Sequence, residues 1–176
     1  MMSERIYLNN DWKFAEQFEA SMTEAAYDDS VMQNVRLPHT CKETPLHYFD
    51  EHCYQMVSGY RRVIEAEEAW KGKKILLTID GAAHDSEVFL NGEKVGEHHC
   101  GYTAFTMDIS GVLRYGEKNI LVVKVGSMED LNIPPFCYVI DYMTYGGIYR
   151  DVYLDIKNTD YIEDIFIRTD IGQMDD

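Results

Sequence analysis

The segment from Ser86 to His99, SEVFLNGEKVGEHH, most constrains the fold, because it predicts a hairpin of two short strands. Asn91 and Gly92 stand between two strand-like runs, and an Asn-Gly pair tolerates the positive φ angles of a tight two-residue turn. Similar short runs follow one another after residue 50, separated by Gly, Pro, Asn and Asp. The other predicted strands are GYRRVIEAE (59–67), KKILLTID (73–80), TAFTMDI (103–109), NILVVKV (119–125), RDVYLDI (150–156) and YIEDIFIRT (161–169).

Helical patterns are scarce, since no segment after residue 70 shows a long 3.6-residue period. One stretch, EASMTEAAYDD from Glu19 to Asp29, has room for a helical turn or two. NIPPF, residues 132–136, is expected to be a rigid extended loop, because each proline fixes its own φ and restrains the residue before it. The 176 residues correspond to one ordinary domain. The sequence therefore predicts an all-β fold, a β-sandwich or a jelly roll.

The net charge of −15 limits the partners that we expect. It repels phosphate backbones and anionic membrane surfaces, so neither nucleic acid nor membrane is predicted as a partner. No apolar run approaches the roughly 20 residues of a membrane span. The start, MMSERIYLNNDW, lacks the apolar core of a signal peptide, so a cytoplasmic location is expected. The four cysteines, Cys41, Cys53, Cys100 and Cys137, are then expected to be free thiols.

Familiar motifs of catalysis and metal binding give little support for either. His98 and His99 precede Cys100, but adjacent strand residues point to opposite faces, so no metal site is predicted. His39, in RLPHT, is more often a hydrogen-bonded structural histidine than a base. The chain has no G-x-S-x-G, G-x-G-x-x-G or P-loop motif, and no cofactor is predicted. Residue types alone leave a Ser-His-Asp or Cys-His triad open, and no carboxylate pair is singled out.

One loop, DYMTYGGIYRDV, places a carboxylate, three tyrosines and two glycines just before a strand. Aromatic faces stack on the C–H faces of sugars, and the Asp141 carboxylate can accept hydrogen bonds from paired hydroxyls. Alternatively, the tyrosines pack on the sandwich end and Asp141 caps a turn, which the local sequence by itself favours. The aromatic residues near Asp141 in sequence are Phe136, Tyr138, Tyr142, Tyr145 and Tyr149.

Several motifs in a fixed order carry a resemblance that covers nearly the whole chain. They are LNNDWKF (8–14), DDSVMQNVRLPHT (28–40), GYRRVIE (59–65), ILLTIDGAAHDSEVFLNGEKVGEHHCGYTAF (75–105), DISGVLRYGEKNILVVKV (108–125) and GGIYRDVYL (146–154). By these motifs the sequence resembles the N-terminal sugar-binding domain of glycoside hydrolase family 2, the family of β-galactosidases, β-glucuronidases and β-mannosidases. Met32 and Gly59 stand where the family often has tryptophan, and both are expected to be packing positions.

The resemblance implies a jelly-roll β-sandwich over residues 1–160. Residues 161–176 would then be a linker or the truncated start of the next domain, which is immunoglobulin-like in the family. Family members continue into a TIM barrel that carries the two catalytic glutamates. Both glutamates are therefore expected to lie outside this chain, so no catalytic residue is predicted in it and the chain alone is expected to be inactive.

The same resemblance assigns roles in the loop. The aspartate at the position of Asp141 reaches the active site of the barrel in β-galactosidases and β-glucuronidases and hydrogen-bonds the hydroxyls of the sugar. Asp141 is thus implied to bind substrate, with Tyr145 packing around it. Gly146 and Gly147 would permit the turn. Arg150 is expected to form a structural ion pair behind the loop.

Three hypotheses follow. The first is the sugar-binding domain of a family 2 β-glycosidase, which supports the missing barrel and lends Asp141 to the sugar pocket. The second is a free-standing carbohydrate-binding module, and the third is a purely structural domain. The expected partners are a β-linked glycoside or oligosaccharide and the downstream domains, and the sequence leaves the oligomeric state open, with a homo-oligomer as one alternative. The I-P-P sequence and YGGIYRDV favour a β-glucuronide or β-galactoside over a β-mannoside.

Overall fold

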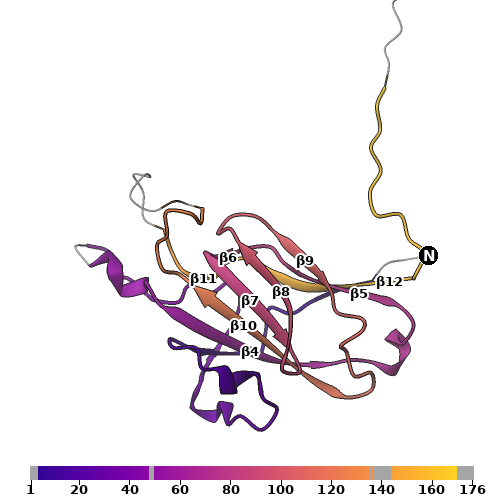
Figure 1. Ribbon diagram of the computed structural model, residues 1–176, viewed down its shortest axis with the longest axis horizontal. Coiled ribbons are helices and arrows are strands. Elements are labelled where there is room, and N and C mark those ends of the chain that lie inside the picture. Colours follow the sequence, from indigo (N-terminus) through magenta and orange to yellow (C-terminus); the bar gives the residue numbers. More distant parts are fainter. Residues whose placement is uncertain (1–3, 48–49, 135, 137–143, 170–176) are drawn as a thin grey trace, which may run out of the picture.

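The computed structural model describes residues 4–47, 50–134, 136 and 144–169, and it shows two antiparallel sheets packed face to face (Figure 1). The four-stranded sheet has the order β1 (Glu4–Tyr7), β12 (Val152–Lys157), β5 (Lys74–Ile79) and β9 (Phe105–Asp108). The six-stranded sheet has the order β3 (Gln33–Val35), β2 (Trp12–Ala15), β4 (Val57–Glu65), β10 (Lys118–Gly126), β7 (Asp85–Leu90) and β8 (Glu93–His99). A small ladder joins β11 (Gly147–Ile148) to β6 (Ala82–Ala83). The all-β sandwich predicted from the sequence is confirmed.

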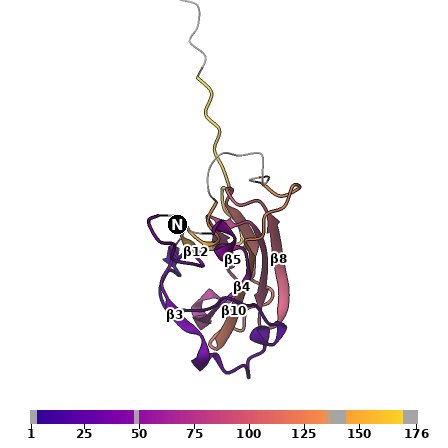
Figure 2. The same ribbon diagram turned by 90° about the vertical axis from the view of Figure 1, so that its left-hand side faces the viewer.

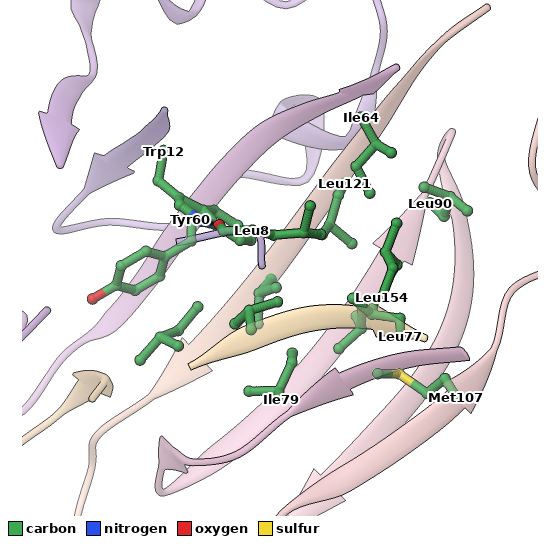
Figure 3. Close-up of a cluster of buried hydrophobic side chains, with 14 of the residues drawn as sticks. Leu8, Trp12, Tyr60, Ile64, Leu77, Ile79, Leu90, Met107, Leu121 and Leu154 are labelled. Carbon is green, nitrogen blue, oxygen red and sulfur yellow. Dashed lines mark hydrogen bonds between the residues drawn. The ribbon is translucent and has the colours of Figure 1, made fainter. Parts of the chain in front are cut away.

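Alternating side chains of both sheets fill the space between the layers. Leu77 of β5 and Leu154 of β12 are paired in register and fully buried, and Leu121 of β10 faces them from the other sheet (Figure 3). Burial of each such leucine contributes about 1.5–3 kcal/mol to folding. Trp12 and Tyr60 continue this core, with their rings edge to face at 6.4 Å. The core therefore makes the sandwich a firm support for the loops at its ends.

A second, smaller cluster lies on the outer face of the six-stranded sheet, beneath residues 18–32, which we call the cover segment. Met22 and Met32 pack there against Val122, and a Cβ on Gly59 would lie 2.6 Å from the Met22 sulfur. Met32 and Gly59 are thus packing positions, as predicted. The cover segment contains two short 3₁₀ turns, η1 (Ala20–Thr23) and η2 (Asp29–Val31), which agrees with the turn or two expected for residues 19–29.

Arg61 holds the cover segment to the sheet. Its side chain, 4% exposed, donates from Nε to the Met22 carbonyl at 3.1 Å and from Nη2 to the Glu24 carbonyl at 3.2 Å. Nη1 pairs with the carboxylate of Asp29. One buried arginine on β4 therefore binds three points of an otherwise irregular segment.

The hairpin predicted from Asn91-Gly92 is confirmed, because these residues join β7 to β8 with φ angles of 54° and 88°. Two further 3₁₀ turns, η3 (Glu51–Tyr54) and η4 (Glu68–Trp70), lie in connections between strands. No helix in the described part of the chain is long and apolar enough to span a membrane.

Two local predictions are wrong. The amide of Phe136 donates to the Ile133 carbonyl at 2.9 Å, so 132–136 contains a turn where an extended loop was expected. Residues 161–169 form no strand and run away from the sandwich (Figures 1 and 2), with Ile162 and Phe166 largely exposed. A strand needs a neighbouring strand to bond to, and the described residues offer this segment none.

Candidate functional site

The described segments on either side of the candidate loop, 127–134 and 144–148, lie at the end of the sandwich where β6 and β11 lie (Figure 1). Asp141 itself, the predicted substrate-binding residue, lies outside the described residues. The structure does describe residues 144–148, which we call the stem, because they bring the chain from the loop back into the sandwich. The geometry of the stem therefore defines where the loop is attached.

The stem is bonded on both sides. On one side, Gly147 and Ile148 pair with Ala83 and Ala82 of β6. On the other side, the amide of His39 donates to the Ile148 carbonyl at 2.8 Å. The stem thus lies between two neighbouring segments like a central strand, which restricts its movement in the plane of this ladder.

Gly147 is required by its backbone conformation and by its surroundings. Its φ of 108° lies in a region that residues with a side chain rarely adopt. A Cβ there would lie 2.7 Å from both the His39 carbonyl oxygen and the Tyr60 hydroxyl. The glycine predicted to permit the turn therefore also permits a close contact with two groups of the scaffold.

His39 joins this contact as a structural residue, as the sequence predicted. Its Nδ1 lies 2.9 Å from the Tyr60 hydroxyl, and its ring packs 4.8 Å from Phe14. Burial lowers the pKa of His39 and raises the pKa of Tyr60, so both are neutral near pH 7. A neutral imidazole and a phenol can hold the stem without any countercharge.

Tyr145, the second predicted site residue, lies at the outer end of the stem. Its ring is 6.2 Å from the buried ring of Tyr54, and 48% of the residue is exposed. One side of Tyr145 therefore packs on the domain while the other side is open to whatever covers this end.

Residues behind the stem tie it to the loop at 100–103. The Tyr149 hydroxyl donates to the Gly101 carbonyl, and Gly101 donates its amide to the Pro134 carbonyl at 3.0 Å. Arg150 donates to the Tyr102 carbonyl at 3.1 Å and stacks on Tyr149, with 5.2 Å between the guanidinium carbon and the ring centre. Arg150 forms no ion pair with any residue that the structure describes, so it holds a loop backbone where an ion pair was expected.

His84 was not singled out by the sequence, yet it lies directly beneath this loop. It is 2% exposed, its Cδ2 would be 3.6 Å from a Cβ on Gly101, and its amide donates to the Gly126 carbonyl at 2.6 Å. Its Nε2 has no hydrogen-bond partner among the described residues. Burial lowers the pKa of His84, so the imidazole is neutral near pH 7.

The two histidines considered for a metal site contact different partners. His98 stacks on Phe105 at 4.4 Å and lies 2.8 Å from the Thr103 hydroxyl. His99 pairs with Asp85 at 2.6 Å. No group of three potential metal ligands occurs among the described residues. Cys41, Cys53 and Cys100 are unpaired thiols.

Large apolar side chains are exposed at the end of the sandwich that carries the stem. Each is at least 41% exposed; four of the five belong to the connection between β10 and β11, and Tyr102 belongs to the loop at 100–103. Exposed apolar side chains that form a contiguous patch commonly mark an interaction surface. They are Tyr102, Met128, Leu131, Phe136 and Tyr145, and we call them the apolar rim.

The fold and the stem together define a β-sandwich module whose stem is bonded on both sides at an end that exposes apolar side chains. A family model, "Glycosyl hydrolases family 2, sugar binding domain", matches residues 7–158. The chain therefore belongs to glycoside hydrolase family 2, as its sugar-binding domain.

Individual relatives agree with this membership. The chain is 40% identical to a β-galactosidase from Thermoanaerobacter pseudethanolicus over 94% of its length, and 34% identical to a β-glucuronidase from Bacteroides fragilis over 87%. Among solved structures, a calcium-binding mutant of Bacteroides uniformis β-glucuronidase 2 superimposes with a TM-score of 0.80 at 33% identity, over 88% of this chain and 18% of that one. The chain covers only 22% of the first relative and 21% of the second, so it spans about a fifth of their length.

Proposed function

We propose that this domain is part of a β-galactosidase-like or β-glucuronidase-like enzyme, in which it supports the catalytic domain and lends Asp141 to the sugar pocket. The observation that carries the proposal is the stem, which is bonded on both sides at an end surrounded by the apolar rim. A stem bonded on both sides suits a task across a domain interface, where a side chain of the attached loop has to meet a group on another body.

The reaction proposed for the whole enzyme is retaining hydrolysis of a β-linked glycoside through a covalent glycosyl-enzyme. The two catalytic glutamates would come from the downstream barrel, so this chain alone would be inactive. Asp141 would accept hydrogen bonds from sugar hydroxyls and strengthen them in the transition state. The relatives include both β-galactosidases and β-glucuronidases, so the two sugars are equal candidates.

Residues 161–176 would begin the next domain or the linker to it. The described part of this segment exposes Ile162, Ile165, Phe166 and Ile167 without packing them on the sandwich, which supports a place in another folded body. The unpaired thiols are compatible with the cytoplasmic location expected from the sequence. The homo-oligomer is likewise part of this proposal and is decided by the mass of the intact protein in solution.

The test is Asp141→Ala in the intact polypeptide that carries this chain. We expect kcat/KM to fall by an amount worth about 2–4 kcal/mol, the scale for removing a charged hydrogen-bond partner. Chromogenic β-galactosides and β-glucuronides, assayed side by side, would also identify the sugar. Asp130→Asn is the matched control, because Asp130 is an exposed loop carboxylate that caps Asn132, and asparagine caps equally well. Wild-type kinetics in Asp141→Ala would refute the role of Asp141.

A purely structural domain is the second candidate, and the apolar rim is its basis, because a supporting contact needs such a surface whether or not the loop binds a sugar. Exchanging the loop at 132–149 for one of a different relative separates the two. Unchanged substrate preference and kcat would support the structural role. A free-standing module would instead bind a β-glycan by itself, with an affinity that we expect to be no better than about millimolar for one open loop.

A further inference from the structure

Ser127 continues the hydrogen bonding of the six-stranded sheet one residue past the last pair of strands β10 and β4. The ladder of β10 and β4 ends at the pair of Gly126 and Val57. Ser127 then donates its amide to the Met56 carbonyl at 2.8 Å, and its Oγ accepts the amide of Met56 at 3.2 Å. The hydroxyl also donates to the Tyr54 carbonyl at 2.5 Å. One fully buried side chain therefore continues the register of the sheet into its loops.

Cys41 adds a second buried group at the same point. Its thiol donates to the Tyr54 carbonyl at 3.4 Å and lies 3.8 Å from the Ser127 hydroxyl. Burial raises the pKa of this thiol, so it is uncharged near pH 7. The backbone of Cys41 meets the stem directly, because its amide donates to the Gly146 carbonyl at 3.0 Å.

Gly146 packs against the side chains of Ser127 and Cys41 so closely that no side chain would fit at residue 146. A Cβ on Gly146 would lie 2.2 Å from the Cβ of Ser127 and 2.8 Å from the sulfur of Cys41. Unlike Gly147, Gly146 has no left-handed φ, so the close approach and not the backbone angle requires glycine here. The main chain of the stem is therefore held at van der Waals contact with Ser127.

We propose that Ser127 and Cys41 are positioning residues that fix the stem, and through it the loop that carries Asp141. The inference rests on the proposed function, because only that function makes the position of the loop matter for catalysis. Ser127 is hydrogen-bonded to Met56 at the end of the β10–β4 ladder of the six-stranded sheet, and Gly146 lies in direct contact with Ser127. The position of the stem relative to the sandwich is thus set by the sheet itself, and a misplacement of about 1 Å in a catalytic group that the stem supports can cost about 100-fold in rate.

The first experiment is Ser127→Ala, made in the intact polypeptide in the wild-type background and in the Asp141→Asn background. Alanine removes the hydroxyl and adds no volume beside Gly146. We expect kcat to fall about tenfold or more in the wild-type background, with KM changing less, and no further fall in Asp141→Asn. A group that supports the domain as a whole would reduce activity equally in both backgrounds, and that result would overturn the proposal. Unchanged kcat in the wild-type background would also overturn it.

The second experiment tests the contact itself and does not depend on activity. Gly146→Ala should displace the stem and speed hydrogen exchange of the Cys41 amide at least tenfold, because that amide bonds to Gly146. Gly111→Ala is the matched control, since nothing lies within 4 Å of a Cβ at that position. Equal exchange rates in Gly146→Ala and wild type would refute the contact. If Asp141→Asn leaves kcat/KM unchanged while the Cys41 amide still responds, the proposed function alone fails.

Discussion

The cover segment and the stem are both irregular stretches on the same sandwich, but the sheets hold them by opposite means. The cover segment has one backbone bond to the sheet, from the Phe18 amide to the Val57 carbonyl, and is otherwise held by long side chains, namely Arg61 and two methionines. The stem is held by its own main chain, with Gly146 and Gly147 against Ser127, His39 and Tyr60. Flexible side chains adjust to small shifts, whereas direct backbone contact leaves no slack. The more tightly held segment is therefore the one that attaches the loop for which we propose a role in sugar binding.

Gly147→Ala should give the largest effect, because it meets both a forbidden backbone angle and two scaffold atoms at 2.7 Å. We expect the free energy of unfolding to fall by about 3 kcal/mol or more, measured by urea denaturation. Gly72→Ala is the control for the backbone angle alone, because Gly72 has a φ of 78° and nothing within 4 Å of a Cβ. Equal losses of unfolding free energy in the two variants would show that the stem can move to accommodate a Cβ at residue 147.

Arg61→Ala should come second and should test the other half of the comparison. It leaves the Asp29 carboxylate and two carbonyls without their shared donor, so we expect a loss of about 2 kcal/mol in unfolding free energy and faster proteolysis within the cover segment. In the intact enzyme kcat/KM should stay within about twofold of wild type, since this segment lies on the outer face of the sheet.

The control for Arg61 is Arg5→Ala, which breaks a two-bond pair with Asp155 in which the arginine side chain is 46% exposed, and which should cost about 1 kcal/mol. A comparable loss of unfolding free energy in the two variants would mean that the three contacts of Arg61 with the cover segment contribute no more than an ion pair at the surface.

The smallest effect should be a dependence on pH that arises at His84. Burial lowers the folded-state pKa of His84 below its ordinary value of 6.5, so the unfolded chain binds a proton that the folded chain does not. Above pH 6.5 His84 is neutral in both states and does not lower the free energy of unfolding. As the pH falls below 6.5, the unfolded chain gains a proton at His84 and the free energy of unfolding decreases. His84→Leu should therefore flatten the dependence of unfolding free energy on pH between about 7 and 5. An unchanged slope would assign the dependence to other groups, of which His39 is the first to test.

Local sequence patterns predicted those parts of the fold that depend on neighbours in sequence. Asn91-Gly92 specified a hairpin because its turn needs only positive φ at two adjacent residues. His39 was correctly interpreted as a structural histidine. The prediction of an extended loop for NIPPF was wrong, because this segment turns. A hydrogen bond from the Phe136 amide to the Ile133 carbonyl closes the turn, and the two prolines do not prevent it.

The contacts that hold the stem could not be predicted from local sequence patterns. Ser127 and Cys41 are separated by 86 residues, and neither belongs to a motif. The Gly146-Gly147 pair indicated a turn, but one glycine is needed for its φ and the other for a contact across the fold. Contacts of this kind depend on how the segments meet in space, which periodicity along a single strand does not report.

The exposed segment at 161–169 has a consequence for handling the chain by itself. Ile162, Ile165, Phe166 and Ile167 form an apolar stretch of high strand propensity that pairs with no strand among the described residues, and exposed segments of this composition tend to form intermolecular β-aggregates. Glu163 and Asp164 interrupt it as gatekeeper charges. Colloidal stability of the isolated chain should thus depend on ionic strength, because added salt screens the repulsion between these carboxylates that keeps the segments of separate molecules apart.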